Sequence, residues 1–159
     1  MTQNTEKRTP RGLRNNNPLN IRITKKQLGC GGWWQGMSAV QQDPCFCQFV
    51  SMKWGWRAAF VLLTKTYYHT RRLYTIRQII SHWAPPQDHN DTEAYISRVA
   101  GAMQWDADEP LGIPSDVPSR WMQLAVAMAI VENGTAALDY MAMLEGWRLA
   151  RMEAVTART

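Results

Sequence analysis

The chain has 159 residues, 45% of them hydrophobic and eight of them tryptophan, so a single domain with a substantial core is expected. Eighteen Lys and Arg against thirteen Asp and Glu give a net charge of +5, which favours an acidic partner such as nucleic acid, an anionic surface or bacterial cell wall. No apolar run approaches the roughly 20 residues that span a bilayer, and the N-terminus lacks the apolar segment of a secretory signal. Membrane insertion and a signal peptide are therefore not expected.

The N-terminal third predicts a tail followed by a small β element. Residues 1–10 are polar and charged and predict a disordered tail, ahead of a single domain over residues 11–159. The stretches NIRI (20–23) and CFCQFV (45–50) alternate as short strands do, and a glycine-rich loop joins them. A small β-hairpin is expected here. The three cysteines cannot all pair within one chain and are expected as reduced thiols, and we expect neither a metal nor another cofactor.

From residue 50 onward the hydrophobic period becomes helical. Residues 54–69 are apolar nearly all round, which predicts a buried central helix. Thr75 and Gln78 have the spacing of a capping box, and Pro85 with Pro86 ends the helix that they begin. The same spacing of Asn90 and Glu93 predicts the start of the next helix.

Two further helices complete the chain and define the fold class. Pro118 occupies the first-turn position that proline tolerates, and Gly134 is a left-handed stop. A last amphipathic helix, 136–155, is expected to pack back on the bundle. The fold class is therefore mainly α with a small β-hairpin near the N-terminus. Between Pro118 and Gly134, one face of the helix is expected to be buried. Its residues are Trp121, Leu124, Met128 and Val131.

Glu132 has the sequence context of a general acid. It flanks the buried stripe in the final turn of its helix, where the helix dipole disfavours negative charge, so the protonated carboxyl is favoured. A protonated carboxyl is what acid-catalysed cleavage of a glycosidic bond requires. Gly134, which lacks a side chain, would let a bulky substrate approach. The alternative is an ordinary exposed glutamate at a helix end.

Ordered motifs from residue 11 to about residue 134 resemble a family found in bacteriophages and prophages, whose members are labelled virion-associated proteins or suspected lysins. The motifs are RGLRNNNPLNIR, WWQG, FCQF, GWRAAFVLL, TIRQIISHWAPP, NDTEAYISRV and AIVENG. Leu19 and Val131 depart from the glycine and histidine expected there. The order NNNPLNIR, WWQG, FCQFVS is also similar to that of bacterial glucosaminidase autolysins, with their E-S-G element replaced by AIVENG at the far end. A circularly permuted lysozyme-like domain would explain this order.

The resemblance implies a set of site residues. Asn15, Asn16, Asn17 and Asn20 would line a sugar-binding cleft together with Arg22, because amides donate to and accept from amino sugars, and Trp34 would stack on a sugar ring. Asparagine also makes turns, so one or two of the four are expected to be structural, and Arg22 has a simple solvated charge as its alternative. The remaining two aromatic candidates, Trp83 and Tyr95, are expected in the core rather than in the cleft.

The implied activity is cleavage of peptidoglycan glycan strands by a muramidase, a glucosaminidase or a lytic transglycosylase. A hydrolase commonly needs a second carboxylate, and Asp43 is the candidate, with an Asp-Pro turn residue as its alternative. A lytic transglycosylase needs one acid, so both reactions remain open.

Two functions of other classes also remain open. One is a non-catalytic virion or tail component, and the other is a basic module that binds nucleic acid. We expect peptidoglycan rather than nucleic acid as the partner. The protein would be made in the cytoplasm and act at the periplasm or cell wall. Delivery inside a phage particle, passage through a holin lesion and injection by a secretion machine all remain open. The oligomeric state is open.

Overall fold

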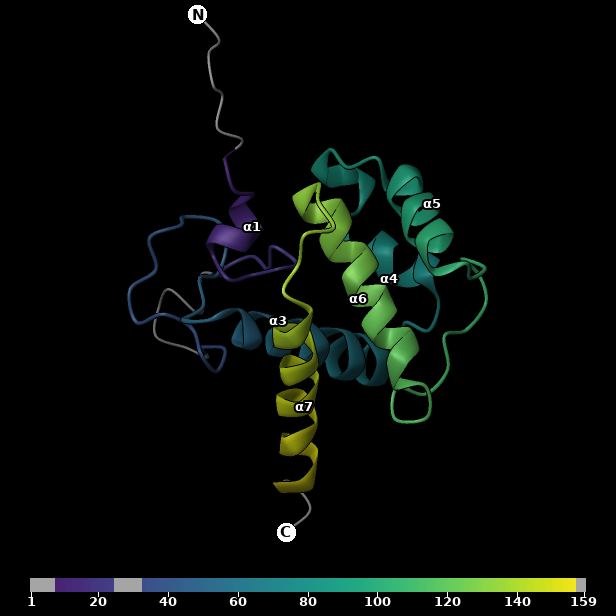
Figure 1. Cartoon of the computed structure of the whole chain (residues 1–159). Coiled ribbons are helices and arrows are strands. Elements are labelled where there is room, and N and C mark those ends of the chain that lie inside the picture. The colour runs from purple at the N-terminus through teal and green to yellow at the C-terminus, as the bar shows by residue number, and fades with distance from the viewer. Residues whose placement is uncertain (1–7, 25–32, 157–159) are drawn as a thin grey trace, which may run out of the picture.

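The computed structural model describes residues 8–24 and 33–156, and these parts of the chain are mainly helical (Figure 1). This agrees with the expected fold class. Residues 1–7 of the predicted tail, and Cys30, lie outside the described residues. In chain order the elements are α1 (Arg11–Arg14), α3 (Met52–Val61), the π-helix η1 (Leu62–Thr70), α4 (Ile76–Trp83), the 3-10 helix η2 (Pro86–Asp88), α5 (Thr92–Met103), α6 (Pro118–Asn133) and α7 (Tyr140–Thr156).

The expected β-hairpin is absent from the described residues, and two isolated antiparallel bridges take its place. One joins Arg22 to Phe46 and the other joins Met37 to Phe49. Side chains form hydrogen bonds with backbone groups that would pair with one another in a longer pair of strands. Asn17 donates to the carbonyl oxygens of Ile21 and Cys47, for example. Such side-chain bonds compete with regular strand pairing, and this competition limits the pairing to single bridges.

Helix α6 lies at the centre of the molecule, with α4 and α5 to one side and the α3–η1 rod passing behind it (Figure 1). Its stripe residues Trp121, Leu124 and Met128 are fully buried, as predicted, whereas Val131 is half-buried. Leu19, which replaces the expected glycine, is also fully buried. The core therefore sits between α6 and the inner faces of α3, α4 and α5.

Helix α7 packs along α3, as expected for the last helix. The Trp147 ring lies edge-on to Phe60, with 5.0 Å between ring centroids. Gly146 permits this approach, because a Cβ atom there would lie 2.5 Å from the Cβ of Trp56. The rod that α7 covers is longer than the predicted helix and changes character, since α3 continues directly into the π-helix η1.

The helix boundaries follow local chemistry. Thr75 and Gln78 form the predicted capping box, and Gly134 ends α6 with a left-handed φ of 66°. The start of α5 differs from the prediction. Asp91 is its N-cap and accepts from the amide of Ala94, while Asn90 donates to the carbonyl of Pro85. Among the described residues, no helix is both long enough and apolar enough to cross a membrane.

Candidate functional site

The carboxylate of Glu132 lies in the last turn of α6 and accepts hydrogen bonds from three separate segments. Oε1 accepts from Nε1 of Trp83 at 2.9 Å and from the hydroxyl of Tyr95 at 3.1 Å. Oε2 accepts from Nδ2 of Asn20 at 3.2 Å. The side chain is half-buried. We call Glu132, Asn20, Trp83 and Tyr95 the carboxylate cluster.

Local structure positions each donor of the carboxylate cluster. Asn20 has a left-handed φ of 51°, a conformation that asparagine tolerates better than most residues and that lets the chain turn toward α6. Trp83 is the last residue of α4, and the C-cap residue Ala84 separates it from the two prolines that follow the helix. Tyr95 is in the first turns of α5, behind the Asp91 cap. Three segments of the chain, a turn and two helices, therefore converge on one carboxylate.

The Tyr95 hydroxyl is a donor at any physiological pH. Burial, and next the negative charge of Glu132, raise the pKa of Tyr95 well above its ordinary value. Nε1 of Trp83 and Nδ2 of Asn20 can donate hydrogen bonds but cannot accept them. All three groups therefore orient Glu132 as an acceptor. Oε1 takes two hydrogen bonds and Oε2 takes one, so Oε2 has the greater remaining capacity to accept a further hydrogen bond.

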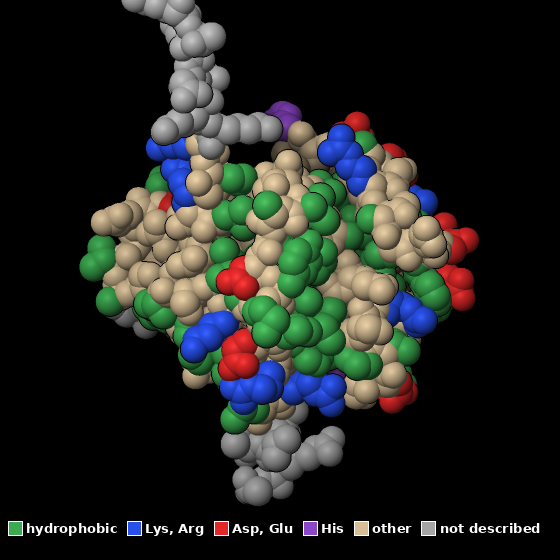
Figure 2. All heavy atoms as spheres, in the orientation of Figure 1, with side chains coloured by type: hydrophobic (Ala, Val, Ile, Leu, Met, Phe, Trp, Pro, Cys, Tyr) green, Lys and Arg blue, Asp and Glu red, His purple; other side chains and the backbone are tan. Residues whose placement is uncertain are grey.

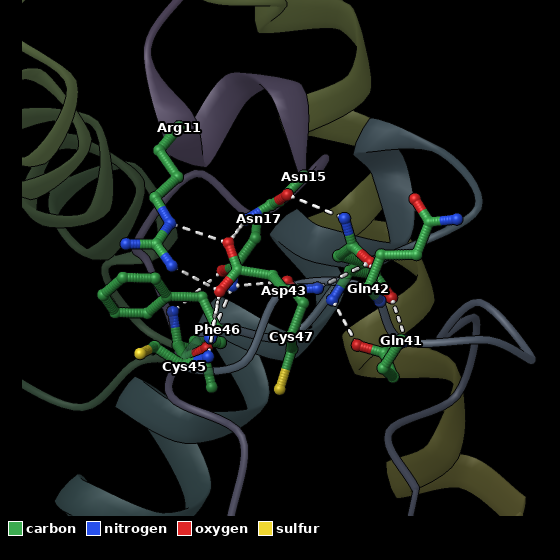
Figure 3. Close-up of polar contacts among 11 residues, drawn as sticks. Arg11, Asn15, Asn17, Gln41, Gln42, Asp43, Cys45, Phe46 and Cys47 are labelled. Carbon is green, nitrogen blue, oxygen red and sulfur yellow. Dashed lines mark hydrogen bonds and ion pairs between the residues drawn. The ribbon is translucent and has the colours of Figure 1, made fainter.

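The other three asparagines hold the N-terminal turn together, and Figure 3 shows two of them, Asn15 and Asn17. Asn15 donates to Asp43 and accepts from Gln48, and Asn16 donates to the carbonyl of Phe49. Asn17 is fully buried, and its Oδ1 accepts from the amide of Ile21. One or two structural asparagines were expected and three have this role. Asn20 is the member of the four that reaches Glu132.

Asp43 is engaged on both oxygens (Figure 3). The guanidinium of Arg11 binds it through two nitrogens at 2.7 and 2.6 Å, and Oδ1 also accepts from the amides of Cys45 and Phe46. The hydrogen bonds from Arg11 hold the pKa of the Asp43 carboxyl well below its ordinary value. Its alternative interpretation as a turn residue accounts for these contacts, so we assign it no catalytic role.

The remaining expected site residues lie apart from the Glu132 contacts. Arg22 is exposed, with its guanidinium 5.6 Å from the centre of the Phe46 ring. Trp34 is half-buried and packs against the core. Gly134 is exposed, and a Cβ atom there would meet nothing within 4 Å, so α6 ends in open space.

Three residues at or beside Glu132 form hydrogen bonds that their sequence positions did not predict. Tyr95 is buried, as expected, but its hydroxyl also binds Glu132, and Trp83 is half-buried with its Nε1 on the same oxygen. Asn133 was not considered. Its Nδ2 donates to the carbonyls of Pro18 and Ala129, both at 2.8 Å, and so seats the N-terminal turn on α6. Gly12 makes this possible, because a Cβ atom there would lie 2.5 Å from Oδ1 of Asn133.

Three hollows stand out on the surface of the described residues, and Glu132 lines none of these three. The largest, of about 870 Å³, lies between η1, the loop at 113–115 and α7. The other two, of about 320 and 370 Å³, flank the outward face of α6, and one of these begins at Gly134. The carboxylate cluster lies at the end of α6, where the Glu132 side chain is half-buried and Tyr95 is buried.

Together these observations define a mainly helical domain with an oriented carboxylate at the end of its central helix. No protein-family model matches the chain. Protein P5 of Pseudoalteromonas phage PM2 is 35% identical over 137 residues, which cover 86% of this chain and 79% of Protein P5. The chain belongs to the family of Protein P5, a family of phage proteins. This supports the phage relationship expected from the motifs.

Proposed function

We propose that the protein cleaves peptidoglycan glycan strands with Glu132 as its general acid, on a lysozyme-like helical domain. The observation that carries the proposal is the convergence of Asn20, Trp83 and Tyr95 on one half-buried carboxylate. A carboxyl held by fixed donors is already oriented, and general acid catalysis contributes about 10²–10⁴-fold in rate when the geometry is right.

Among the two cleavage reactions, we favour that of a lytic transglycosylase. The candidate for a second carboxylate, Asp43, is bound on both oxygens by Arg11, Asn15 and backbone amides. A transglycosylase needs one acid, because the substrate supplies its own nucleophile. No cofactor takes part in the proposed reaction.

The proposed step conserves atoms and protons. Oε2 of Glu132 gives its proton to the glycosidic oxygen while the bond from that oxygen to C1 of the muramic acid residue breaks. The 6-hydroxyl of the same muramic acid then bonds to C1, and its proton returns to Glu132. The products are a 1,6-anhydro end and a free sugar hydroxyl, and no water is consumed.

The test is mass spectrometry of the fragments that the protein releases from purified peptidoglycan. We expect anhydro-muramic ends from the wild type and at least a 100-fold lower yield from Glu132→Gln. The matched control is Glu109→Gln, which makes the same change at an exposed position. New reducing ends would indicate a hydrolase, and the absence of products from the wild type would overturn the enzymatic proposal.

The second candidate is a non-catalytic virion component, which the relationship to a phage protein favours. This candidate predicts that purified virions contain the protein, and that Glu132→Gln leaves both assembly and infectivity unchanged. Loss of infectivity by Glu132→Gln, with assembly intact, would instead favour the enzyme. The expectation of a nucleic-acid-binding module has no similar support and is not proposed.

A further inference from the structure

One hollow on the described part of the chain is lined by residues that take no part in the proposed function. It measures about 870 Å³ and lies between η1, the loop at 113–115 and the second half of α7. We call it the η1–α7 groove. Its volume is within the range of about 300–1,000 Å³ that is common for small-molecule sites. The lining residues are Thr64, Lys65, His69, Ile113, Pro114, Ser115, Trp147, Arg148, Ala150, Arg151 and Met152.

The floor and rim of the η1–α7 groove are apolar. Trp147 is buried against Phe60 at one side of the groove, and Ala150 is buried beside it. Ile113 and Met152, which both line this groove, are 49% and 53% exposed, so their apolar surface is available to a ligand. An apolar body would therefore be desolvated along this side.

Among the described residues, the charged side chains that line the η1–α7 groove are all basic. They are Lys65, Arg148 and Arg151, with His69 also in the lining, and no Asp or Glu is among these described lining residues. Arg148 also pairs with Glu145 on its own helix, so part of its charge is compensated. The Arg151 guanidinium lies 5.9 Å from the centre of the Trp147 ring, at the boundary between the basic and apolar parts. Figure 2 shows Lys and Arg side chains gathered over the end of the molecule where α7 lies.

We propose that the η1–α7 groove binds one molecule of an anionic amphiphile, with its phosphate or carboxylate head beside Arg151 and its apolar body along Trp147, Ile113 and Met152. Charge complementarity selects the anionic head, and the exposed apolar rim selects against a fully hydrated anion. A lipid taken from a bilayer and a soluble amphiphile share this chemistry. The site does not involve Glu132, so the proposal is independent of the proposed catalysis.

The test is isothermal titration calorimetry of the full chain with dodecyl phosphate below its micelle concentration. We expect saturable binding of one molecule to the wild type and to Glu132→Gln. Arg151→Glu should weaken the affinity about tenfold, because it reverses one charge at the head-group position. Arg98→Glu, an equal change of net charge at an exposed position on α5, should leave the affinity unchanged. Circular dichroism confirms that each variant is folded.

Comparison ligands identify what the η1–α7 groove recognises. We expect inorganic phosphate and dodecyl maltoside to bind at least tenfold more weakly than dodecyl phosphate. Equal binding of either would overturn the amphiphile assignment, as would an equal effect of Arg98→Glu and Arg151→Glu. Phosphatidylglycerol vesicles that bind the protein and compete with dodecyl phosphate would identify a bilayer lipid as the source. Vesicles that bind without competing would place membrane contact elsewhere and contradict the lipid source, leaving a soluble amphiphile.

Discussion

The Tyr95 side chain is buried and its hydroxyl donates to Glu132, so removal of this hydroxyl tests the positioning of the carboxylate. Tyr95→Phe deletes one of two hydrogen bonds on Oε1 and leaves that of Trp83. Under the proposed reaction, we expect kcat to fall about tenfold with KM nearly unchanged, because the loss acts through Glu132. The measurement is the rate of anhydro-end release.

Tyr140→Phe is the matched control for Tyr95→Phe. Its side chain is exposed, and its hydroxyl donates to the carbonyl of Ala136. This variant should retain the wild-type rate. A change of KM alone in Tyr95→Phe would contradict the positioning role and indicate substrate contact.

The Asp43 carboxylate is expected to stabilise the N-terminal turn in a pH-dependent way. Its pKa is lowered in the folded chain, chiefly by the hydrogen bonds from Arg11. The stabilisation is therefore present above the ordinary Asp pKa of about 3.9 and is lost as the pH falls below it toward the folded value. At pH 7, Asp43→Asn should lower the free energy of unfolding by about 2 kcal/mol.

Urea denaturation at pH 7 and at pH 3 measures this effect. The difference in the free energy of unfolding between wild type and Asp43→Asn should be smaller at pH 3. At that pH the wild type loses part of the stabilisation from the ionised Asp43 carboxylate, which the variant lacks at every pH. Asp116→Asn, at an exposed turn before α6, is the control and should show little difference at either pH. An equal difference at both pH values would show that Asp43 acts through shape and not through its charge.

At the scale of elements, the contact between α7 and α3 depends on a residue without a side chain. A Cβ atom at Gly146 would lie 2.5 Å from the Cβ of Trp56 and 2.8 Å from the amide nitrogen of Arg57, both of which are held within α3. Gly146→Ala should therefore push the two helices apart and lower the free energy of unfolding by about 2 kcal/mol.

Gly101→Ala is the natural comparison for Gly146→Ala. Gly101 lies within α5, is exposed, and would place a Cβ atom with nothing within 4 Å. Alanine is a better helix former than glycine, so this variant should gain about 0.5–1 kcal/mol. Chemical denaturation of both variants checks the pair. Shifts of the same sign would contradict close packing as the cause.

At the scale of the whole molecule, hydrogen bonds tie the first turn to the end of α6. Asn20 binds Glu132, and Asn133 binds the carbonyl of Pro18, across 112 and 115 positions of sequence. These bonds, and the packing of α7 on α3, predict one cooperative domain over residues 11–159. Thermal unfolding followed by far-ultraviolet circular dichroism and by tryptophan fluorescence should give one coincident transition. A separate early loss of helix would show that α7 or the N-terminal turn unfolds alone.

The amino-acid sequence by itself determined the helical class and most helix ends. The capping box at Thr75, the proline that starts α6 and the left-handed stop at Gly134 act within a few residues, so local chemistry is sufficient to read them. The buried stripe of α6 follows from a helical period. The motifs also indicated a phage family, and Protein P5 supports that relationship.

The tertiary structure alone decided which polar residues share a site. Asn17 donates hydrogen bonds to backbone carbonyls on both sides of the expected hairpin, and Asp43 accepts hydrogen bonds from Arg11. The spacing of these residues in the sequence predicts neither contact. The partners of Glu132 lie 37, 49 and 112 positions away. Periodicity reports which face of an element is buried, whereas a hydrogen bond between distant segments depends on where the folded chain brings them together.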